Sequence, residues 1–422
     1  MLLRSRIVLP MTAPPVEDGA VLVSGDRIEA VGRWADLRDS SPGPVVDLGE
    51  TVLLPGLINA HCHLDYTHLA CHLAPPRRFT DWLQGMLGLK AGWSFSEYAG
   101  SWLAGAGQSV RSGCTSVMDF EAVPELLPEV WHGTPLRVIS ALELTGVRSG
   151  RRAEDILDEA LSRIDRLTPS PGKSMALAPH APYSTRAELI RLTAQAAKER
   201  RLPIACHVAE SIDEYEMFVA SSGPMHQWLR SQREMSDCGR GTPLRHVAEQ
   251  GMLGERTLLV HLNYLGEGDV ECVAASGAAV VHCPRSHEYF GHAPFEYRRL
   301  REAGIRVGLG TDSLVSVRRC GAGMPVLSLF DEMQAFLRHH PTATPAEVLT
   351  MVTRTGAWLL GREGELGEVR SGCLADLIVV PYSGSTEGVE SGVVRHRGDV
   401  PGVMIDGKWV VVPPGAQAGG RE

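Results

Sequence analysis

The sequence has no run of about 18 consecutive apolar residues, so it offers no segment that could cross a bilayer as a helix. Its first 21 residues hold only a short apolar run interrupted by Pro10, Pro14 and Pro15, unlike a secretory signal peptide. It also lacks clusters of Lys or Arg, and 41 basic against 50 acidic residues give a formal net charge of −9. We therefore expect neither nucleic acid nor a membrane as a partner, because anionic partners are attracted by a positive field.

The nine cysteines include no C-x-x-C pair, and their number is odd. This pattern excludes a cysteine zinc site and a disulfide framework of the kind that stabilises small secreted domains. Several cysteines lie in apolar runs, where a free thiol packs as a small hydrophobic group. We therefore expect reduced cysteines and a cytoplasmic protein. A G-x-G-x-x-G turn is also missing after the first central apolar run, which disfavours a dinucleotide-binding fold.

The two ends of the chain are rich in short strand-like runs, whereas the middle is not. A length of 422 residues allows two or three domains of about 150 residues each, or one large barrel with a small companion. Residues 21–32 and 403–412 each read as a hairpin around a Gly-Asp or Asp-Gly turn. We predict that residues 1–53 and 363–422 together form one small β-sandwich domain.

Between residues 54 and 362, short apolar runs alternate with stretches of helical spacing. The eight runs are Leu57–His63, Cys114–Phe120, Leu136–Glu143, Ser174–His180, Leu202–Glu210, Thr257–Leu265, Ala278–Arg285 and Ile305–Asp312. Continuous apolar strands are typical of parallel sheets whose faces are covered by helices. Eight strand–helix units in about 310 residues predict an α/β fold, a (β/α)8 TIM barrel over residues 54–362.

Two of the intervening stretches have clear helical spacing. They cover Arg152–Arg166 and Arg186–Arg201. The second follows Ser184-Thr185, with Glu188 placed to complete an N-terminal cap.

Polar residues at the carboxyl ends of the strands face the active site in a barrel of this kind. Five of the eight predicted strand ends carry a histidine, which is too orderly for scattered surface residues. The strand-end residues are His61, His63, Asp119, Glu121, Glu143, His180, His207, Glu210, His261, His287 and Asp312. We therefore predict a site at this mouth of the barrel.

His61 and His63 lie two residues apart on the first strand, which places both imidazoles on one face. Such a pair alone could equally be structural or exposed. Together with His207 on the fifth strand and Asp312 on the eighth, it makes three imidazoles and one carboxylate. Burying an unpaired carboxylate costs several kcal/mol, which a cation would offset. The donor set predicts a divalent ion, with Zn2+ the first choice and Fe2+ the alternative.

Glu210 and His261 are the candidates for proton transfer. Glu210 follows His207 by three residues, just past the strand end, where a carboxyl group could carry a proton to a leaving group. The alternative is an ordinary loop glutamate at the surface. His261 ends the sixth strand. Three roles are open to it: a ligand of a second metal, a hydrogen-bonding partner of the attacking water, or a histidine of the core.

The sequence favours one ion over two. The fourth strand has no lysine that could bridge two ions, although Glu143 on the third strand leaves a bridged site open. We therefore predict one divalent ion, with His261 outside its coordination.

Six motifs in order resemble the amidohydrolase superfamily, in the branch that holds S-adenosylhomocysteine/methylthioadenosine deaminases, guanine and cytosine deaminases and triazine chlorohydrolases. The motifs cover nearly the whole chain, and the flanking strands fit that family's small composite domain. They are LPGLINAHCHL at 54–64, APHAPYS at 178–184, HVAE at 207–210, LVH at 259–261, HCPRS at 282–286 and GTDS at 310–313.

The resemblance assigns roles to individual residues. It implies that the metal is bound by His61, His63, His207 and Asp312. It makes Glu210 and His261 the proton-handling pair, with Asp312 also orienting the attacking hydroxide. His180 and Ser316 would contact the substrate. His287, which stands where many relatives have asparagine, and Arg148, in the loop after the third strand with Arg151 and Arg152, are further substrate candidates. The resemblance also implies a homo-oligomer.

The chain departs from the nucleoside deaminases in one respect. Residues 81–90 lack the glutamate with which those enzymes grip ribose hydroxyls. The segments HLDYT and PRSHEYFG are similar to a subgroup that deaminates 6-aminodeoxyfutalosine and other adenine-bearing compounds.

We therefore expect hydrolytic deamination of an aminated heterocycle, an adenine-type purine nucleoside or derivative such as S-adenosylhomocysteine, methylthioadenosine or 6-aminodeoxyfutalosine. One alternative is a chlorohydrolase or cyclic-amide hydrolase using the same site. Another is a non-catalytic metal-binding protein that acts in assembly. The unrelated zinc deaminase fold is excluded by the missing C-x-x-C.

Overall fold

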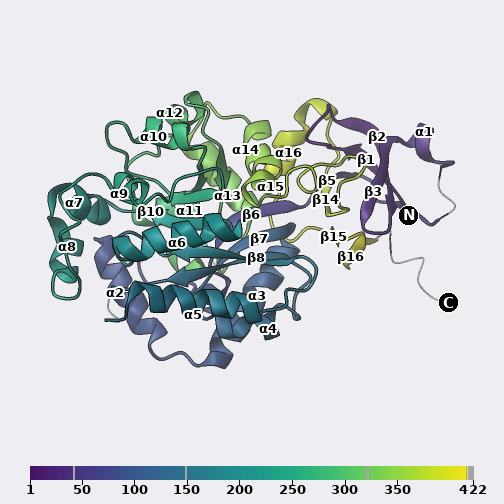
Figure 1. Ribbon diagram of the computed structural model, residues 1–422. Helices are drawn as coiled ribbons and strands as arrows, with labels where there is room; N and C mark the ends of the chain where they lie inside the picture. The colour runs from purple at the N-terminus through teal and green to yellow at the C-terminus, as the bar shows by residue number, and fades with distance from the viewer. Residues whose placement is uncertain (41–42, 148–149, 320–322, 415, 417–422) are drawn as a thin grey trace.

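The structure is a computed structural model that describes residues 1–40, 43–147, 150–319, 323–414 and 416. A barrel of parallel strands wrapped by helices forms the larger part of the molecule, and a mixed sheet built from both ends of the chain lies beside it (Figure 1). Across the described residues, no helix is both long enough and apolar enough to span a bilayer.

The barrel consists of eight strands that are hydrogen-bonded in chain order, each parallel to its neighbours. The strands are β6 (Leu57–Cys62), β7 (Cys114–Glu121), β8 (Arg137–Leu144), β9 (Lys173–Pro179), β10 (Ile204–Val208), β11 (Thr257–His261), β12 (Ala279–His282) and β13 (Val307–Leu309). Every predicted apolar run overlaps one of these strands, and β7, β8 and β9 each extend one residue beyond their runs. The predicted barrel is therefore confirmed, although the later strands are shorter than their runs.

The ring of strands closes where β13 meets β6. Thr311 N–H donates to the His61 carbonyl at 2.9 Å, and the Asn59 amide donates to Thr311 Oγ1 at 2.8 Å. A side chain on Gly310 would not fit, because a Cβ there would lie 2.7 Å from the His61 carbonyl oxygen. Glycine therefore allows the last strand to approach the first at the level of the predicted metal ligands.

Helices and short 3-10 segments connect the strands. After β6 and β7 come η1 (Leu64–Leu69), α2 (Phe79–Lys90), α3 (Phe95–Arg111), η2 (Pro124–Leu126) and α4 (Leu127–Val130). After β8, β9 and β10 come α5 (Ala153–Arg166), α6 (Ala187–Arg200), α7 (Ile212–Ala220), α8 (Gly223–Leu229) and α9 (Pro243–Glu249). After β11, β12 and β13 come α10 (Asp269–Ser276), α11 (Pro284–Phe290), α12 (Tyr297–Glu302), η3 (Leu314–Ser316), α13 (Leu329–His339), α14 (Pro345–Met351) and α15 (Arg354–Leu359).

The two predicted helices are present as α5 and α6, but the expected cap of α6 is wrong. The helix begins after Arg186, without a side-chain cap. Ser184 is instead hydrogen-bonded to His180 Nδ1 at 2.7 Å, and Thr185 Oγ1 donates to the Leu144 carbonyl at 2.9 Å. Tertiary partners therefore take the two hydroxyls that the local sequence offered as a cap.

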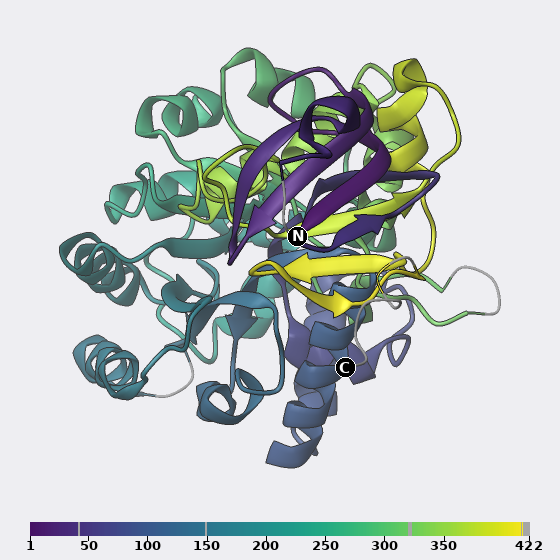
Figure 2. The same cartoon turned by 90° about the vertical axis from the view of Figure 1, so that its right-hand side faces the viewer.

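Strands from both ends of the chain form one mixed sheet, here called the terminal sheet. Its strands are β1 (Leu2–Val8), β2 (Val16–Ser24), β3 (Arg27–Arg33), β4 (Val45–Asp47), β5 (Thr51–Pro55), β14 (Leu377–Pro381), β15 (Gly402–Ile405) and β16 (Lys408–Val411). Strand β5 pairs with β1 on one side and with β14 on the other, so the two ends meet at its centre. Figure 2 shows the purple and yellow strands side by side. Helices α1 (Trp34–Leu37) and α16 (Val389–Val394) and the segment η4 (Thr386–Gly388) flank it.

The predicted β structure from both termini is thus confirmed. The exact division into residues 1–53 with 363–422 and residues 54–362 stays a prediction.

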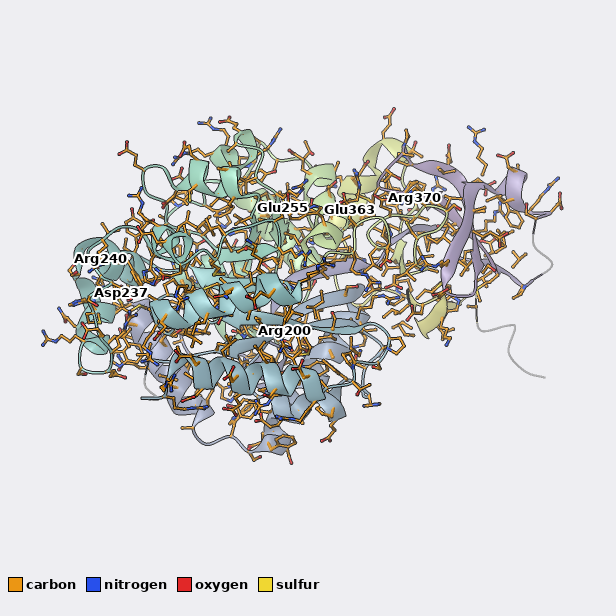
Figure 3. The ribbon with its side chains drawn as sticks, in the orientation of Figure 1. Arg200, Asp237, Arg240, Glu255, Glu363 and Arg370 are labelled. Atoms are coloured by element: carbon orange, nitrogen blue, oxygen red, sulfur yellow. The ribbon has the colours of Figure 1, made fainter. Side chains whose placement is uncertain are left out.

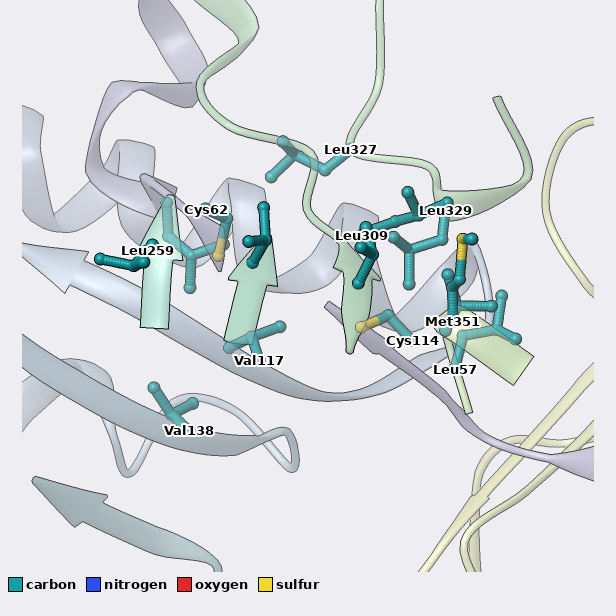
Figure 4. Packing of buried hydrophobic residues seen from close by; sticks show 14 of the residues in the cluster. Leu57, Cys62, Cys114, Val117, Val138, Leu259, Leu309, Leu327, Leu329 and Met351 are labelled. Carbon is teal, nitrogen blue, oxygen red and sulfur yellow. The ribbon is translucent and has the colours of Figure 1, made fainter. Parts of the chain in front are cut away.

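The largest core fills the space between strands and helices. Figure 4 shows Leu57, Val117 and Leu309 of the strands near Leu329 and Met351 of the helices, all buried. The eight described cysteines are free, as expected.

A buried ion pair joins the barrel to the terminal sheet. Arg137, at the start of β8, donates from Nε and Nη2 to the two carboxylate oxygens of Asp376 at 2.7 and 3.0 Å. The Arg137 and Asp376 side chains are only 7% and 3% exposed, and Asp406 also contacts the guanidinium. Removing one partner would leave a buried charge uncompensated.

We expect Arg137→Ala to lower the free energy of unfolding by about 3–5 kcal/mol, as measured in urea. The matched control is Arg200→Ala. Arg200 forms an exposed pair with Asp165 at 2.6 Å on the outer helices (Figure 3), and its loss is expected to cost about 1 kcal/mol or less. Equal losses in the two variants would contradict the structural role given to Arg137.

Candidate metal centre

Most of the functional candidates gather at the carboxyl ends of the barrel strands. There a cavity of about 560 Å3 is lined by His63, His180, His207, Glu210, His261 and Asp312. His61 lies near the end of β6, and His63 is the first residue after that strand. His207 lies on β10, His261 ends β11, and Asp312 follows β13. The strand-end rule therefore identifies residues that lie close together in the structure.

The four predicted ligands surround a common point. The His61 ring centre lies 4.9 Å from those of His63 and His207. Asp312 Oδ1 lies 3.7 Å from His61 Nε2 and 3.8 Å from His63 Nε2. Their side chains are at most 9% exposed. Such a group of imidazoles and one carboxylate has the composition of a divalent metal site.

His261 and Glu210 lie against the same point. The potential ligand atoms fall into three groups, and within each group all atoms lie within 4.8 Å of one another. The groups are His61, His207 and His261; His61, His63 and Asp312; and Glu210, His261 and Asp312. The geometry therefore brings together all six residues that the sequence placed at the metal or in proton transfer. It does not by itself choose which of them bind an ion.

Unsatisfied polar atoms show that the site suits a cation. Both ring nitrogens of His61 and Nδ1 of His63 are buried and make no hydrogen bond within the described chain. Buried polar atoms are rarely left without a partner, and a metal ion would supply one. His207 Nδ1 donates to the His180 carbonyl at 2.8 Å, which leaves Nε2 free to bind and fixes the ring.

The electrostatics keep the imidazoles of His63 and His261 neutral and the Asp312 carboxyl group ionised. Burial, together with the neighbouring His61, lowers the pKa of His63 to about 3. Burial also lowers the pKa of His261 to about 3. Burial alone would raise the pKa of Asp312, but its contact with His61 and the nearby imidazoles hold it well below the usual range. Ser313 N–H, at 2.7 Å, and Ser316 Oγ, at 3.1 Å, donate to the Asp312 carboxylate.

The backbone at this end of the barrel is strained. Ala209, His261, Leu262 and Asp312 have φ values of 50°, 74°, 48° and 52°, although none is a glycine. Each such residue costs about 1–3 kcal/mol unless its surroundings hold it. Here Asn263 N–H donates to the Ala209 carbonyl at 3.0 Å, and Leu262 N–H donates to the Val208 carbonyl at 3.0 Å. Strain of this kind concentrates at functional sites.

Glu210 is buried and held from both sides. Its Oε1 lies 3.6 Å from His261 Nε2, its N–H donates to Glu214 at 2.9 Å, and its carbonyl accepts from the Asn263 amide at 2.9 Å. Burial, aided by the charges of Asp312 and Glu214, raises the pKa of Glu210 well above its usual range. The Glu210 carboxyl therefore keeps its proton to higher pH than an ordinary glutamate does, which suits an acid catalyst.

Glu214 makes folding stability depend on pH. Burial raises its pKa from 4.5 to about 8, although backbone N–H groups oppose the shift. The folded state therefore binds this proton more tightly than the unfolded state, and its contribution is full below pH 4.5 and lost as the pH rises through about 8.

We expect Glu214→Gln to gain stability relative to the parent as the pH rises from 4.5 to 8, because glutamine does not ionise in this range. The amide oxygen of glutamine still accepts from Glu210 N–H. The difference in free energy of unfolding between variant and parent should change by at most about 1.4 kcal/mol per pH unit, as measured by urea unfolding of the metal-free proteins. Glu267→Gln, at an exposed position, is the control. A constant offset between Glu214→Gln and parent at every pH would refute this role.

His180 lines the cavity beside His61, His63 and His207, here called the His cluster. Its Nε2 lies 3.9 Å from Glu143 Oε1, and Glu143 lies 4.0 Å from His63 Nδ1. Burial lowers the pKa of His180. The ring is therefore presented to whatever fills the cavity, in a position consistent with the predicted substrate contact.

The other substrate candidates are placed differently. Ser316 is fully buried against Asp312, and His287 is hydrogen-bonded to Asn263 at 3.1 Å. Neither is among the residues that line the cavity, where Ser313 appears instead. Arg148 falls outside the described residues. The substrate roles of these three residues stay predictions.

Arg151 and Arg152 lie on the surface. Arg151 pairs with Glu159 and Arg152 with Glu154, and the two arginine side chains are 49% and 72% exposed. They form the start of a solvated helix face rather than part of the cavity.

Sequence reasoning missed a polar group just beyond His63. Asp65 is buried, and neither carboxylate oxygen has a hydrogen-bond partner in the described chain. Tyr66 stacks on His63, with ring centres 5.3 Å apart, and the Lys90 ammonium lies 4.5 Å from the Tyr66 ring centre. The signal was the segment HLDYT, in which Asp65 and Tyr66 follow shortly after the predicted metal ligands His61 and His63.

Comparison with known proteins gives consistent matches. Residues 52–410 match the amidohydrolase family, and residues 19–43 match a bacterial imidazolonepropionase-like composite domain. A 5-methylthioadenosine/S-adenosylhomocysteine deaminase of Syntrophobacter fumaroxidans is 32% identical over 379 residues, which cover 87% of this chain and 80% of that protein. An aminodeoxyfutalosine deaminase of Deinococcus radiodurans is 29% identical over 309 residues, covering 71% and 72%.

A solved structure has the same fold. An adenosine deaminase of Xanthomonas campestris with bound zinc superposes with a TM-score of 0.84 at 25% identity, covering 98% of this chain and 93% of that one. The similarity therefore extends over the barrel and the terminal sheet together.

Proposed function

This chain belongs to the amidohydrolase family, and we propose that it is a metal-dependent deaminase that releases ammonia from an adenine-type purine nucleoside or derivative. The observation that carries this proposal is the buried Glu210 carboxyl, which lies 3.6 Å from His261 and beside Asp312 and whose pKa is raised by burial. Relatives that deaminate adenine nucleosides cover most of the chain.

One divalent ion, Zn2+ or Fe2+, would be held by His61, His63, His207 and Asp312. The unpartnered nitrogens of the His cluster and the ionised Asp312 support this assignment. When bound, such an ion lowers the pKa of water from about 15.7 towards about 7, which makes a nucleophile available at neutral pH. His261 would remain outside the coordination, with its Nε2 3.6 Å from the Glu210 carboxyl.

The chain's own residues would manage the protons. Glu210 donates its proton to the ring nitrogen beside the amino-bearing carbon, which makes that carbon electrophilic. Asp312 accepts a proton from the attacking water and orients it. His261, neutral because its pKa is about 3, is a hydrogen-bonding partner for the tetrahedral intermediate. The new C–O bond forms, Asp312 passes the water's proton to the amino group, and ammonia leaves as the C–N bond breaks. The new hydroxyl gives its proton back to Glu210, which restores the acid and leaves the 6-oxo product.

The acid at Glu210 favours deamination over the other reactions of this site. Ammonia requires a proton to leave, whereas chloride does not. A chlorohydrolase or cyclic-amide hydrolase is therefore the second choice. We infer a small-molecule substrate, of which S-adenosylhomocysteine, methylthioadenosine and 6-aminodeoxyfutalosine are the candidates. A homo-oligomer is also proposed, from the family resemblance alone.

An ammonia-release assay tests the proposal. The panel is adenosine, S-adenosylhomocysteine, methylthioadenosine, 6-aminodeoxyfutalosine, guanine and cytosine, with protein purified without chelators. We expect turnover of at least one adenine nucleoside to its 6-oxo product. Absence of turnover across the panel, with chloro-triazine or cyclic-amide hydrolysis present, would contradict deamination.

A further inference from the structure

Asn263 ties together the two connections that carry Glu210 and His261. It lies two residues after His261, the last residue of β11, and its side chain is buried. Its amide Nδ2 donates to the Glu210 carbonyl at 2.9 Å, and its backbone N–H donates to the Ala209 carbonyl at 3.0 Å. The ends of β10 and β11 are therefore joined beside the Glu210 and His261 side chains, which lie 3.6 Å apart.

His287, a buried residue of α11, is hydrogen-bonded to the other end of the same amide. Its Nδ1 lies 3.1 Å from Asn263 Oδ1. The Glu210 carbonyl can only accept a hydrogen bond, so Asn263 must face it with Nδ2 and face His287 with Oδ1. Because Oδ1 also only accepts, His287 has to donate from Nδ1. Burial lowers the pKa of His287 to about 4, so the ring carries one proton at neutral pH and that proton is on Nδ1.

The backbone on both sides of the Glu210 side chain is held by buried side chains. Glu214 accepts from Glu210 N–H at 2.9 Å, and Asn263 donates to the Glu210 carbonyl. Ala209, directly before Glu210, has a φ of 50°, a conformation that persists in a non-glycine residue only when its surroundings hold it. An Asn263 amide that could turn over would present Oδ1 to the Glu210 carbonyl, and two acceptors repel each other. The orientation of this amide therefore matters for the position of the acid.

We propose that His287 is a positioning residue, which donates from Nδ1 to Asn263 and so fixes the amide that holds Glu210 beside His261. This inference rests on the proposed function, in which Glu210 is the acid. His287 is not among the described residues that line the cavity, so its effect is expected on the reaction step and not on the binding of substrate. The role differs from the substrate contact that the family resemblance implies.

The first test is His287→Ala, assayed with the adenine nucleoside that the ammonia-release panel identifies. We expect kcat to fall about 10- to 100-fold, because a small displacement of a catalytic group is costly, while KM changes less than about threefold. The metal content should stay at one ion per chain. A rise in KM with kcat unchanged would make His287 a substrate contact and overturn the inference, as would unchanged kinetics.

Two further variants separate positioning from packing. His287→Asn offers an amide N–H at about the position of the imidazole Nδ1, and it should restore kcat to within about threefold of the parent. The control is His292→Ala, which removes a ring 5.4 Å from that of His287. His292 is hydrogen-bonded to Tyr264 at 3.3 Å and makes no hydrogen bond to Asn263, so kcat should stay within about threefold. Equal losses in all three variants would overturn the inference.

A double variant tests whether His287 acts through Glu210. In Glu210→Gln, the further change His287→Ala should lower kcat less than about threefold, because the acid that His287 positions is already absent. If the separate losses of Glu210→Gln and His287→Ala multiplied in the double variant, His287 would act elsewhere and the inference would be wrong.

The tautomer of His287 gives a readout that does not depend on activity. In 15N-histidine-labelled protein at pH 7, the His287 signal, identified by its loss in His287→Asn, should show the proton on Nδ1. A proton on Nε2 would overturn the inference, and this measurement decides if His287→Ala does not fold. If Glu210→Gln loses activity but His287→Ala does not, the inference fails and the deaminase assignment stands. If no adenine nucleoside releases ammonia, both fail.

Discussion

Glu210→Gln is expected to lower kcat by at least about 100-fold while the metal content stays at one ion per chain. Glutamine keeps the shape and the position between His261 and Glu214 but has no proton to donate to the heterocycle. Steady-state kinetics with metal analysis of the same sample would measure both quantities. Glu188→Gln, at an exposed position of α6, is the matched control and should retain full activity.

The pH profile gives an independent readout of the same residue. Because burial raises the pKa of Glu210, its acid form persists to higher pH than that of an ordinary glutamate, and activity should fall as the pH rises through the raised pKa. In Glu210→Gln the residual activity should lack this alkaline limb. Near wild-type activity in Glu210→Gln, or an unchanged alkaline limb, would remove Glu210 from the mechanism.

His207→Ala is expected to weaken metal binding by more than about 100-fold and to abolish measurable turnover in protein freed of excess metal. His207 is the only proposed ligand supplied by β10, and its ring is already held by the His180 carbonyl. The variant should therefore lose an ion without a large change in fold. Competition with a chromophoric chelator, together with circular dichroism, would measure both.

The control for His207→Ala is His339→Ala, which removes a half-exposed imidazole that pairs with Glu288. It should bind metal and turn over substrate like the parent. If His207→Ala kept its ion and its activity, the proposed ligand set would be wrong, and His261 would become the leading nitrogen donor.

The barrel could be predicted because its strands are buried on both faces and appear in the sequence as uninterrupted apolar runs. The site followed from the same pattern, since polar residues such as His207 and His261 interrupt those runs at their carboxyl ends. Parallel strands bring such ends together whatever their separation in the chain. Periodicity and the strand-end rule were therefore sufficient for the six central residues.

Other features depend on contacts that no local pattern contains. Arg137 and Asp376 are 239 residues apart, and nothing around either position indicates the pairing. Ser184 and Thr185 looked like a helix cap until His180 and Leu144 were seen to take their hydroxyls.

The left-handed backbone conformation at the site could not be predicted from the sequence either. Positive φ values are expected at glycine, and the residues that adopt them after the strands are instead alanine, histidine, leucine and aspartate.

The most direct test of the central claim is an anomalous difference map at the metal absorption edge, from crystals of protein purified without chelators. We predict one peak per chain, about 2.0–2.2 Å from nitrogens of His61, His63 and His207 and from an oxygen of Asp312. A map without a peak among these four side chains, or with two peaks bridged by Glu143, would contradict the single-ion site on which the proposed chemistry depends.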